Sequence, residues 1–233
     1  LDNGIAHLKF FSLAGEAASE AVAAIDGLAA QRMRGLVLDL RGVADGSFAN
    51  GLRLADYFLR AGSTIVSSRG RRAGSSTKSV DSVPEPHPEL ALVVLVDRGT
   101  AGAAELVAGA LQDHDRALVL GETTFGRGSV QTLFPMQDGY SLRLSTAVWV
   151  TPAGRVIQHL PPREDGADTD SVPPRPKYKT EAGRLVQGGG GIVPDHGIRL
   201  TGADGADLGL ATARSLLERS SSPKALLTLA LQP

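Results

Sequence analysis

Three largely apolar runs dominate the hydrophobic pattern of this chain, at residues 35–40, 91–96 and 117–121. Short runs rich in Val and Leu are typical of strands that are buried on both faces of a sheet. Imperfect alternation over residues 4–11 indicates another strand, and Ile65 with Val66 indicates a short one. The pattern therefore predicts a sheet whose central strands lie deep in the core.

Apolar residues at helical spacing separate and follow these strands. They predict helices over residues 16–33, 49–59, 205–219 and 223–231, and a further helix that begins after Gly102. Residues 132–135 and 140–150 flank a Gln-Asp-Gly turn and predict a hairpin. This order predicts an α/β fold: a layered core with a mixed β-sheet, flanked by helices, β-hairpins and a C-terminal helical segment.

Two stretches lack periodicity. Residues 67–89 are rich in Ser, Arg, Gly and Pro and predict an exposed excursion. Residues 161–177 are predicted to be a mobile loop or linker. We therefore interpret residues 1–200 as a core domain that contains this loop, and residues 201–233 as a C-terminal helical segment that packs on it.

Composition excludes several classes of function. The 233 residues carry a formal net charge of −1, which gives no general attraction to nucleic acid or an anionic membrane. The chain has no cysteine, which excludes disulfides and a cysteine nucleophile, and no apolar stretch approaches the roughly 20 residues of a membrane span. Its His, carboxylate and glycine spacings match no metal or phosphate-binding motif, so we expect no metal and no other cofactor.

The most informative stretch is 91–111, where a buried strand enters a helix through Gly99-Thr-Ala-Gly102. Such a turn directs several backbone N–H groups toward one point at the positive end of the helix dipole. That point suits an anion, or a carbonyl oxygen that acquires negative charge. A tight turn without a ligand shows the same pattern, so this stretch alone leaves both interpretations open.

Eight short motifs follow one another between Gly4 and about Gly197. They begin at Leu38 (Leu-Asp-Leu-Arg-Gly), Leu92 (Leu-Val-Val-Leu-Val-Asp-Arg-Gly-Thr-Ala), Glu105 (Glu-Leu-Val-Ala-Gly-Ala-Leu-Gln-Asp), Arg116 (Arg-Ala), Gly121 (Gly-Glu-Thr-Thr-Phe-Gly-Arg-Gly-Ser-Val-Gln), Leu142 (Leu-Arg-Leu-Ser-Thr-Ala), Thr151 (Thr-Pro-Ala-Gly-Arg-Val-Ile-Gln) and Gly190 (Gly-Gly-Ile-Val-Pro-Asp). Their order resembles the core domain of the carboxy-terminal processing peptidases, the tail-specific serine proteases of family S41. The resemblance implies that family's ClpP/crotonase-like α/β core.

The family uses a serine–lysine dyad, but the residues of this chain at the two dyad positions lack that chemistry. The nucleophile position falls on Gly102 and the general-base position on Arg127, whereas the orienting glutamine is present as Gln131. Glycine has no hydroxyl that could form an acyl-enzyme. Arginine, with a pKa above about 12, does not act as a base near neutral pH.

The resemblance also implies an oxyanion hole made of backbone N–H groups, from Ala103 and from the loop that contains Asp45 and Gly46. Asp45 replaces a family glycine, and its carboxylate either opposes developing negative charge or faces solvent. Arg127 is interpreted as a surface arginine that replaced lysine by drift, or alternatively as a fixed cation that binds a peptide carboxylate or pairs with an acid.

These substitutions predict an inactive S41-like protein, a pseudoprotease that acts in peptide or protein binding or in assembly. The expected ligand is an unfolded polypeptide or a protein C-terminus. Three alternatives stay open: an active serine endopeptidase that uses an off-motif hydroxyl (Thr100, Ser129 or Ser47) with His114 or His159, an engineered inactive form of such an enzyme, and a structural module that forms an oligomer.

The family usually carries a PDZ domain ahead of this core, and none is found in residues 1–233. The chain begins at Leu1 within a predicted strand, so we expect a domain excised from a longer protein. The family resemblance implies a location in the cell envelope or periplasm, outside the cytoplasm.

Overall fold

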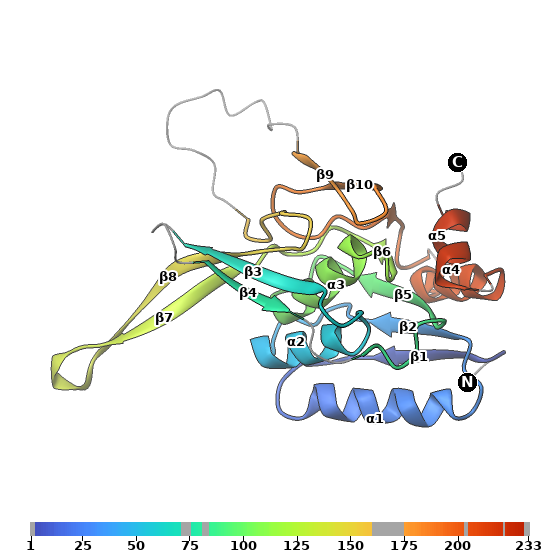
Figure 1. The fold of residues 1–233 in the computed structure, drawn as a ribbon, viewed down its shortest axis with the longest axis horizontal. Coiled ribbons are helices and arrows are strands. Elements are labelled where there is room, and N and C mark those ends of the chain that lie inside the picture. Colours follow the sequence, from blue (N-terminus) through green and yellow to red (C-terminus); the bar gives the residue numbers. More distant parts are fainter. Residues whose placement is uncertain are drawn as a thin grey trace.

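A five-stranded parallel sheet forms the centre of the molecule (Figure 1). The computed structural model describes residues 3–70, 76–80, 84–159, 175–202, 205–220 and 222–230. Every neighbouring pair in the sheet runs parallel. In spatial order its strands are β1 (Ile5–Lys9), β2 (Gly35–Asp39), β5 (Ala91–Val96), β6 (Leu118–Gly121) and β11 (His196–Gly197).

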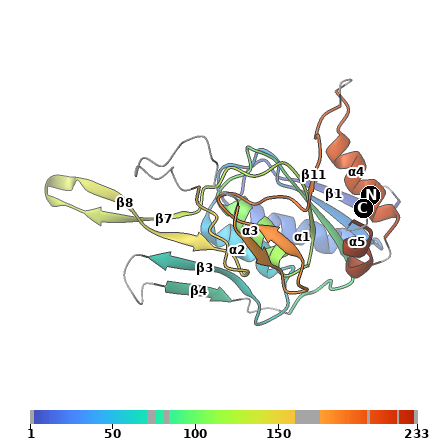
Figure 2. The same cartoon turned by 90° about the horizontal axis from the view of Figure 1, so that it is seen from above.

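Helices cover both faces of this sheet (Figures 1 and 2). One face packs against α1 (Ala17–Ala29), α2 (Phe48–Asp56) and α3 (Ala103–Asp113), and the other packs against α4 (Leu208–Glu218) and α5 (Pro223–Ala230). Alternate strand residues enter the two core layers: Val94 faces the α3 side, and Val93 and Leu95 face the α4 side. This explains the continuous apolar runs. None of the described helices is long and apolar enough to cross a bilayer.

A second, antiparallel sheet lies beside the first, with strand order β4-β3-β8-β7. Its strands are β3 (Thr64–Gly70), β4 (Ser76–Val80), β7 (Ser129–Pro135) and β8 (Ser141–Val150). A 3-10 turn, η1 (Gln137–Gly139), closes the β7–β8 hairpin, which projects from the body (Figures 1 and 2). A small separate pair consists of β9 (Lys177–Lys179) and β10 (Leu185–Gln187).

The predicted layered α/β class and the hairpin are confirmed, with the parallel and antiparallel strands in separate sheets. The exposed excursion predicted over 67–89 is partly wrong, because β3 continues to Gly70 and pairs with β4. Antiparallel pairing supplies the backbone hydrogen bonds of these polar strands, and polar composition alone does not reveal it. Most of the loop predicted over 161–177 lies outside the described residues, and its last residue, Lys177, begins β9.

Arg41 connects the end of β2 to the beginning of α4. Its guanidinium donates to the buried Asp39 carboxylate (Nη2–Oδ2 2.6 Å) and to Asp207, the N-cap of α4 (Nη1–Oδ1 and Nη2–Oδ2, both 2.8 Å). Hydrogen bonding from Arg41 lowers the pKa of Asp207 to about 2. Burial raises the pKa of Asp39, but hydrogen bonds from Arg41 and His7 outweigh it, and the net shift is downward.

This ion cluster predicts an acid-sensitive contribution to stability. Because both carboxyl groups have a lower pKa in the folded state, the contribution is complete above about pH 4 and is lost as the pH falls toward about 2. We expect Asp207→Asn to reduce the fall in the free energy of unfolding over that range, as measured by urea denaturation at successive pH values. Asp138→Asn, in the exposed η1 turn, is the control and should leave the fall unchanged.

Candidate active site

Three loops meet at the carboxyl ends of β2, β5 and β6, at residues 40–46, 97–102 and 122–128. Parallel strands bring their carboxyl ends to one edge, which is where open α/β sheets place their ligands. Backbone hydrogen bonds join the loops: Ala101 N–H donates to Val43 O (2.8 Å), and Phe125 N–H donates to Thr100 O (3.0 Å). The three loops therefore form one connected unit, which we call the three-loop site.

Asp97 and Thr100 stabilise the central loop from inside. The Asp97 Oδ1 atom accepts from the backbone N–H groups of Gly42 and Gly99, both at 2.9 Å. The Thr100 hydroxyl donates to Leu40 O (2.9 Å) and accepts from Asp97 N–H (3.0 Å). Thr100 is completely buried. Its hydroxyl is a structural group rather than a free nucleophile.

Gly102, at the predicted nucleophile position, is the N-cap of α3 and has φ 63° and ψ −116°. Residues with a side chain rarely adopt this conformation, and the sharp strand-to-helix turn that presents the nucleophile of α/β-hydrolases is strained in a similar way. A Cβ atom placed on Gly102 would meet no atom within 4 Å. The turn therefore has room for a side chain at residue 102.

A completely buried carboxylate, Glu105, holds this turn against the following loop. Its Oε2 atom accepts from the backbone N–H groups of Gly102 (3.0 Å) and Arg127 (2.7 Å). Its Oε1 atom accepts from Gly126 N–H (2.7 Å) and from the Thr124 hydroxyl (2.5 Å). Glu105 thus ties the predicted nucleophile position to the predicted base position through their main chains.

Burial raises the pKa of the Glu105 carboxyl, and the hydrogen bonds from Thr124 and the three amides offset only part of that rise. The unfolded chain releases this proton at a lower pH than the folded chain does. The contribution of Glu105 to stability therefore decreases as the pH rises above the ordinary pKa of a glutamate. The three amides can only donate, so the carboxylate form matches their hydrogen bonds best.

Arg127 is exposed at the edge of the three-loop site, and it crosses from one loop to another. Its Nη1 atom donates to Ala44 O (2.9 Å), and its guanidinium lies 5.2 Å from the centre of the Phe125 ring. No carboxylate of a described residue forms an ion pair with Arg127. The structure therefore gives Arg127 specific contacts, while the predicted pairing with an acid is absent from the described residues.

The predicted oxyanion residues lie around the same site. Ala103 is the buried first residue of α3, so its N–H has no acceptor within the helix. The exposed Asp45 carboxylate accepts from the Ser12 hydroxyl (Oγ–Oδ2 2.8 Å). Gly46 has φ 129° and lies against Leu13, where a Cβ atom would approach the Leu13 Cβ to 2.5 Å. Only glycine fits at this position without moving the chain.

Gln131 is exposed on β7 and lines a cavity of about 410 Å³. Phe48 and Trp149 form an aromatic pair in its wall, with ring centroids 5.0 Å apart. Ser129, one of the predicted alternative nucleophiles, also lines it. None of the lining residues is a histidine or a lysine, so the cavity offers Ser129 no general base.

The remaining residues considered as an alternative nucleophile or base lie in different parts of the structure. Ser47 is the N-cap of α2 and accepts from Asn50 N–H (3.1 Å). His114 lies at the far end of α3, about 18 Å along the helix axis from Gly102, and contacts Thr64 O (2.7 Å) and Glu181 (2.9 Å). The backbone N–H of His159 donates to Gly126 O (2.8 Å). Within the described part of the chain, no group of three metal-ligating side chains could hold a metal ion.

The sequence interpretation missed the central role of Glu105. A usable signal was present, since an acidic residue at the third position of an otherwise apolar helix is typical of a capping box. That signal predicts the bond to Gly102 N–H. It does not predict the three donors from residues 124–127, which reach Glu105 only through the tertiary fold.

Replacing Glu105 by glutamine should destabilise the fold. Each carboxylate oxygen accepts two hydrogen bonds, so the new NH₂ group faces donors in either orientation. We expect Glu105→Gln to lower the free energy of unfolding by about 2–4 kcal/mol, measured by urea denaturation. The control is Glu122→Gln, which removes only an exposed contact to Arg98 (3.3 Å) and should cost less than about 1 kcal/mol. Equal losses in both variants would contradict the role of Glu105.

Comparison with known proteins gives the family of this chain. The model of peptidase family S41 matches residues 2–166. A carboxy-terminal-processing protease of Bartonella bacilliformis is 36% identical over 186 residues, which cover 77% of this chain and 42% of that protein. The chloroplastic carboxyl-terminal-processing peptidase 2 of Arabidopsis thaliana is 38% identical over 151 residues, covering 64% of this chain and 29% of that protein. The chain thus spans less than half the length of these relatives.

Solved structures show the same fold. The photosystem II D1 C-terminal processing protease has a TM-score of 0.57 at 35% identity, over 65% of this chain and 39% of that one. A lipoprotein from Streptococcus agalactiae has a TM-score of 0.59 at 15% identity, over 94% of this chain and 68% of that one, and supports the fold alone. The chain resembles the carboxy-terminal processing proteases in sequence and in fold, and it belongs to peptidase family S41.

Proposed function

We propose that this chain is a non-catalytic member of the S41 family that binds polypeptide segments at the three-loop site. The observation that carries the proposal is the pair of residues at the reacting positions, Gly102 and Arg127. The surrounding turn conformation, the Glu105 hydrogen bonds and the room beside Gly102 are all present. The site has the frame of a serine peptidase but lacks its reacting atoms.

Neither step of acyl transfer has a suitable group. A covalent intermediate needs an oxygen or sulfur nucleophile, and Gly102 offers none. A general base needs an accessible neutral form, and an arginine guanidinium stays protonated. Arg127 also donates to the Ala44 carbonyl, a contact that suits a positioning group rather than a proton acceptor.

The groups that remain are suited to binding. The N–H of Ala103, at the positive end of α3, favours a carbonyl or carboxylate oxygen. Only one guanidinium nitrogen of Arg127 donates to Ala44, which leaves donors for a ligand. The relatives are named as proteases that process carboxyl termini. By this analogy we propose an unstructured polypeptide, and specifically its C-terminal carboxylate, as the ligand, and a location outside the cytoplasm.

Restoring the dyad tests the loss of chemistry. We expect no cleavage of an unstructured polypeptide by the natural chain, and measurable hydrolysis by the double variant Gly102→Ser with Arg127→Lys. The open space at Gly102 accepts the serine, at a backbone strain of about 1–3 kcal/mol. Gly102→Ser alone is the control and should remain near background because it lacks the base. Turnover by the natural chain, or its labelling by a serine-directed probe in mass spectrometry, would support the active-endopeptidase alternative instead.

A binding experiment tests the proposed ligand. We expect a fluorescently labelled unstructured peptide with a free C-terminus to bind the natural chain, and Arg127→Ala to weaken binding about tenfold, the loss of one charge-assisted hydrogen bond. Arg219→Ala, at the exposed C-terminal end of α4, is the matched control. The same peptide with an amidated C-terminus separates recognition of a carboxylate from recognition of the main chain. Equal anisotropy curves for all three proteins would contradict the proposal.

A further inference from the structure

The β7–β8 hairpin, residues 129–150, belongs to the antiparallel sheet at its base, and its distal part forms an arm that projects from the body (Figures 1 and 2). Near the body, β3 pairs with β8, and this pairing ends at Gly70 and Ala147. Beyond that point, residues 141–146 pair only with β7 among the described strands. A two-stranded ribbon is marginally stable in water by itself, so the distal arm has little support in the monomer.

The pairing register gives the distal arm two different faces. Phe134 lies opposite Leu142, and Thr132 lies opposite Leu144. Met136 N–H donates to Tyr140 O (2.8 Å), which continues the same alternation toward the tip. Because side chains alternate across a strand, one face presents apolar side chains from Leu144 to the tip, with Thr132 beside Leu144 at the inner end. This apolar arm face consists of Phe134, Met136, Tyr140, Leu142 and Leu144.

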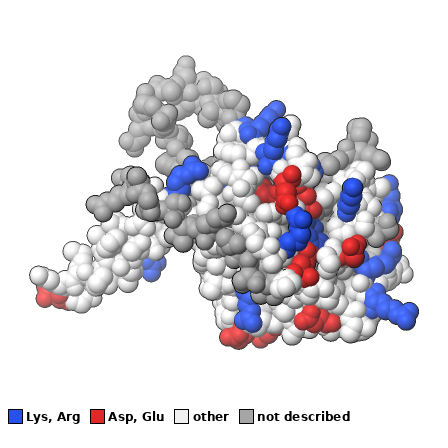
Figure 3. Space-filling view, in the orientation of Figure 1, with Lys and Arg blue, Asp and Glu red and all other residues white. Residues whose placement is uncertain are grey.

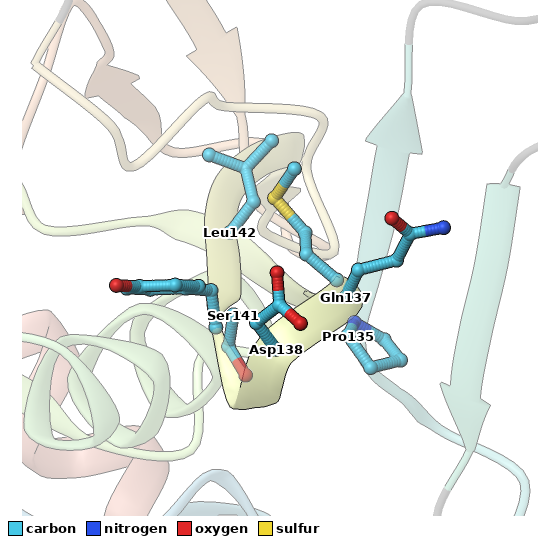
Figure 4. A pocket seen from close by; sticks show the side chains of 7 residues that line it. Pro135, Gln137, Asp138, Ser141 and Leu142 are labelled. Atoms are coloured by element: carbon cyan, nitrogen blue, oxygen red, sulfur yellow. The ribbon is translucent and has the colours of Figure 1, made fainter.

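The opposite face is more polar. It carries Leu133 and Pro135, together with Ser141, Arg143 and Ser145. The close view of the tip shows Leu142 on one side of the ribbon, with Ser141 and Pro135 on the other (Figure 4). A shallow hollow at the tip is lined in part by Met136 and Leu142. The arm is therefore amphipathic in the manner of a strand pair that covers a core, although the described chain places no core beneath it.

The apolar arm face is open to solvent. The exposed fraction of its five side chains runs from 42% for Phe134 to 73% for Tyr140. With about 150–250 Å² per large side chain, the face presents roughly 400–650 Å². That lies in the upper part of the range for the largest apolar patch of a typical monomer, about 300–600 Å², and such patches are often functional. It also supplies about half to four-fifths of the roughly 800 Å² that each partner buries in a stable complex.

Charge gives the arm no preference for an ionic partner. Asp138 and Arg143 are the only charged residues between 129 and 150. In the space-filling view the arm carries almost no blue or red side chains, whereas such charged side chains are frequent on the body (Figure 3). An apolar face with so few charges is matched in chemistry by the same face of a second copy. Under a two-fold axis, both copies bury the same residues in one contact.

We infer that the apolar arm face is a self-association surface, on which the arm of a second copy of this chain packs. The contact places two arms face to face, with Phe134 and Leu142 of each copy in the centre and Leu144 at the inner end. It buries both exposed faces at once and turns two weakly supported ribbons into a double layer with an apolar interior. The dimer does not depend on the proposed peptide binding, and it leaves the three-loop site on the body of each copy.

Sedimentation velocity over a concentration series tests this inference. We expect the natural chain to change from monomer to dimer as its concentration rises. We expect Leu144→Lys to raise the dissociation constant of the dimer at least tenfold. The matched control is Leu133→Lys, the same substitution at an exposed leucine on the opposite face of the arm, which should leave the dimer intact. A natural chain that stays monomeric at every concentration, or equal dissociation of the dimer by both substitutions, would overturn the inference.

The absence of cysteine permits a second, independent measurement. A single thiol introduced by Leu142→Cys lies on the apolar arm face, and one introduced by Ser141→Cys lies on the other face. We expect a maleimide reagent to modify the first thiol several-fold more slowly at concentrations where the dimer forms than at high dilution, and the second at an unchanged rate. A dimer in which both thiols react at the same rate as in the monomer would show that copies meet elsewhere, and would reject the arm contact.

Discussion

The buried carboxylate of Glu105 is the interaction on which the geometry of the three-loop site depends. It accepts four hydrogen bonds, and three come from main-chain amides of Gly102, Gly126 and Arg127. Because these donors are backbone groups, the position of the loops does not require particular side chains at residues 102 and 127. A charged group with no exposure would be unfavourable without such partners, so the carboxylate and the loops stabilise each other.

This arrangement separates the frame of the site from its chemistry. Asp97, Thr100 and Glu105 hold the loops through bonds to amides and carbonyls. The side chains at residues 102 and 127 contribute little to this frame, apart from the contact between Arg127 and the Ala44 carbonyl. The side chains at these two positions can therefore differ while the turn keeps its shape. Glycine adopts the positive φ at residue 102 without strain.

The two sheets of the molecule differ in how their apolar residues are covered. The central parallel strands are apolar on both faces and lie between two helical layers. The distal β7–β8 ribbon has one apolar face, and in the described chain no helix or sheet covers it. The same period-two alternation thus produces a closed core in one sheet and an open surface in the other, depending only on what packs against it.

The sequence by itself determined the elements whose signal is local. Continuous apolar runs predicted β2, β5 and β6, the turn at residues 137–139 predicted the hairpin, and the order of motifs predicted the S41 fold. It did not predict β4, because a polar strand shows its structure only through its pairing with β3. The donors that converge on Glu105 were not predicted either. The same holds for the contact of Arg127 with Ala44, which joins residues 83 positions apart. Only the tertiary structure decided these features, because long-range contacts depend on how the elements are placed together in space. For the same reason, only the tertiary structure decided which apolar faces are covered.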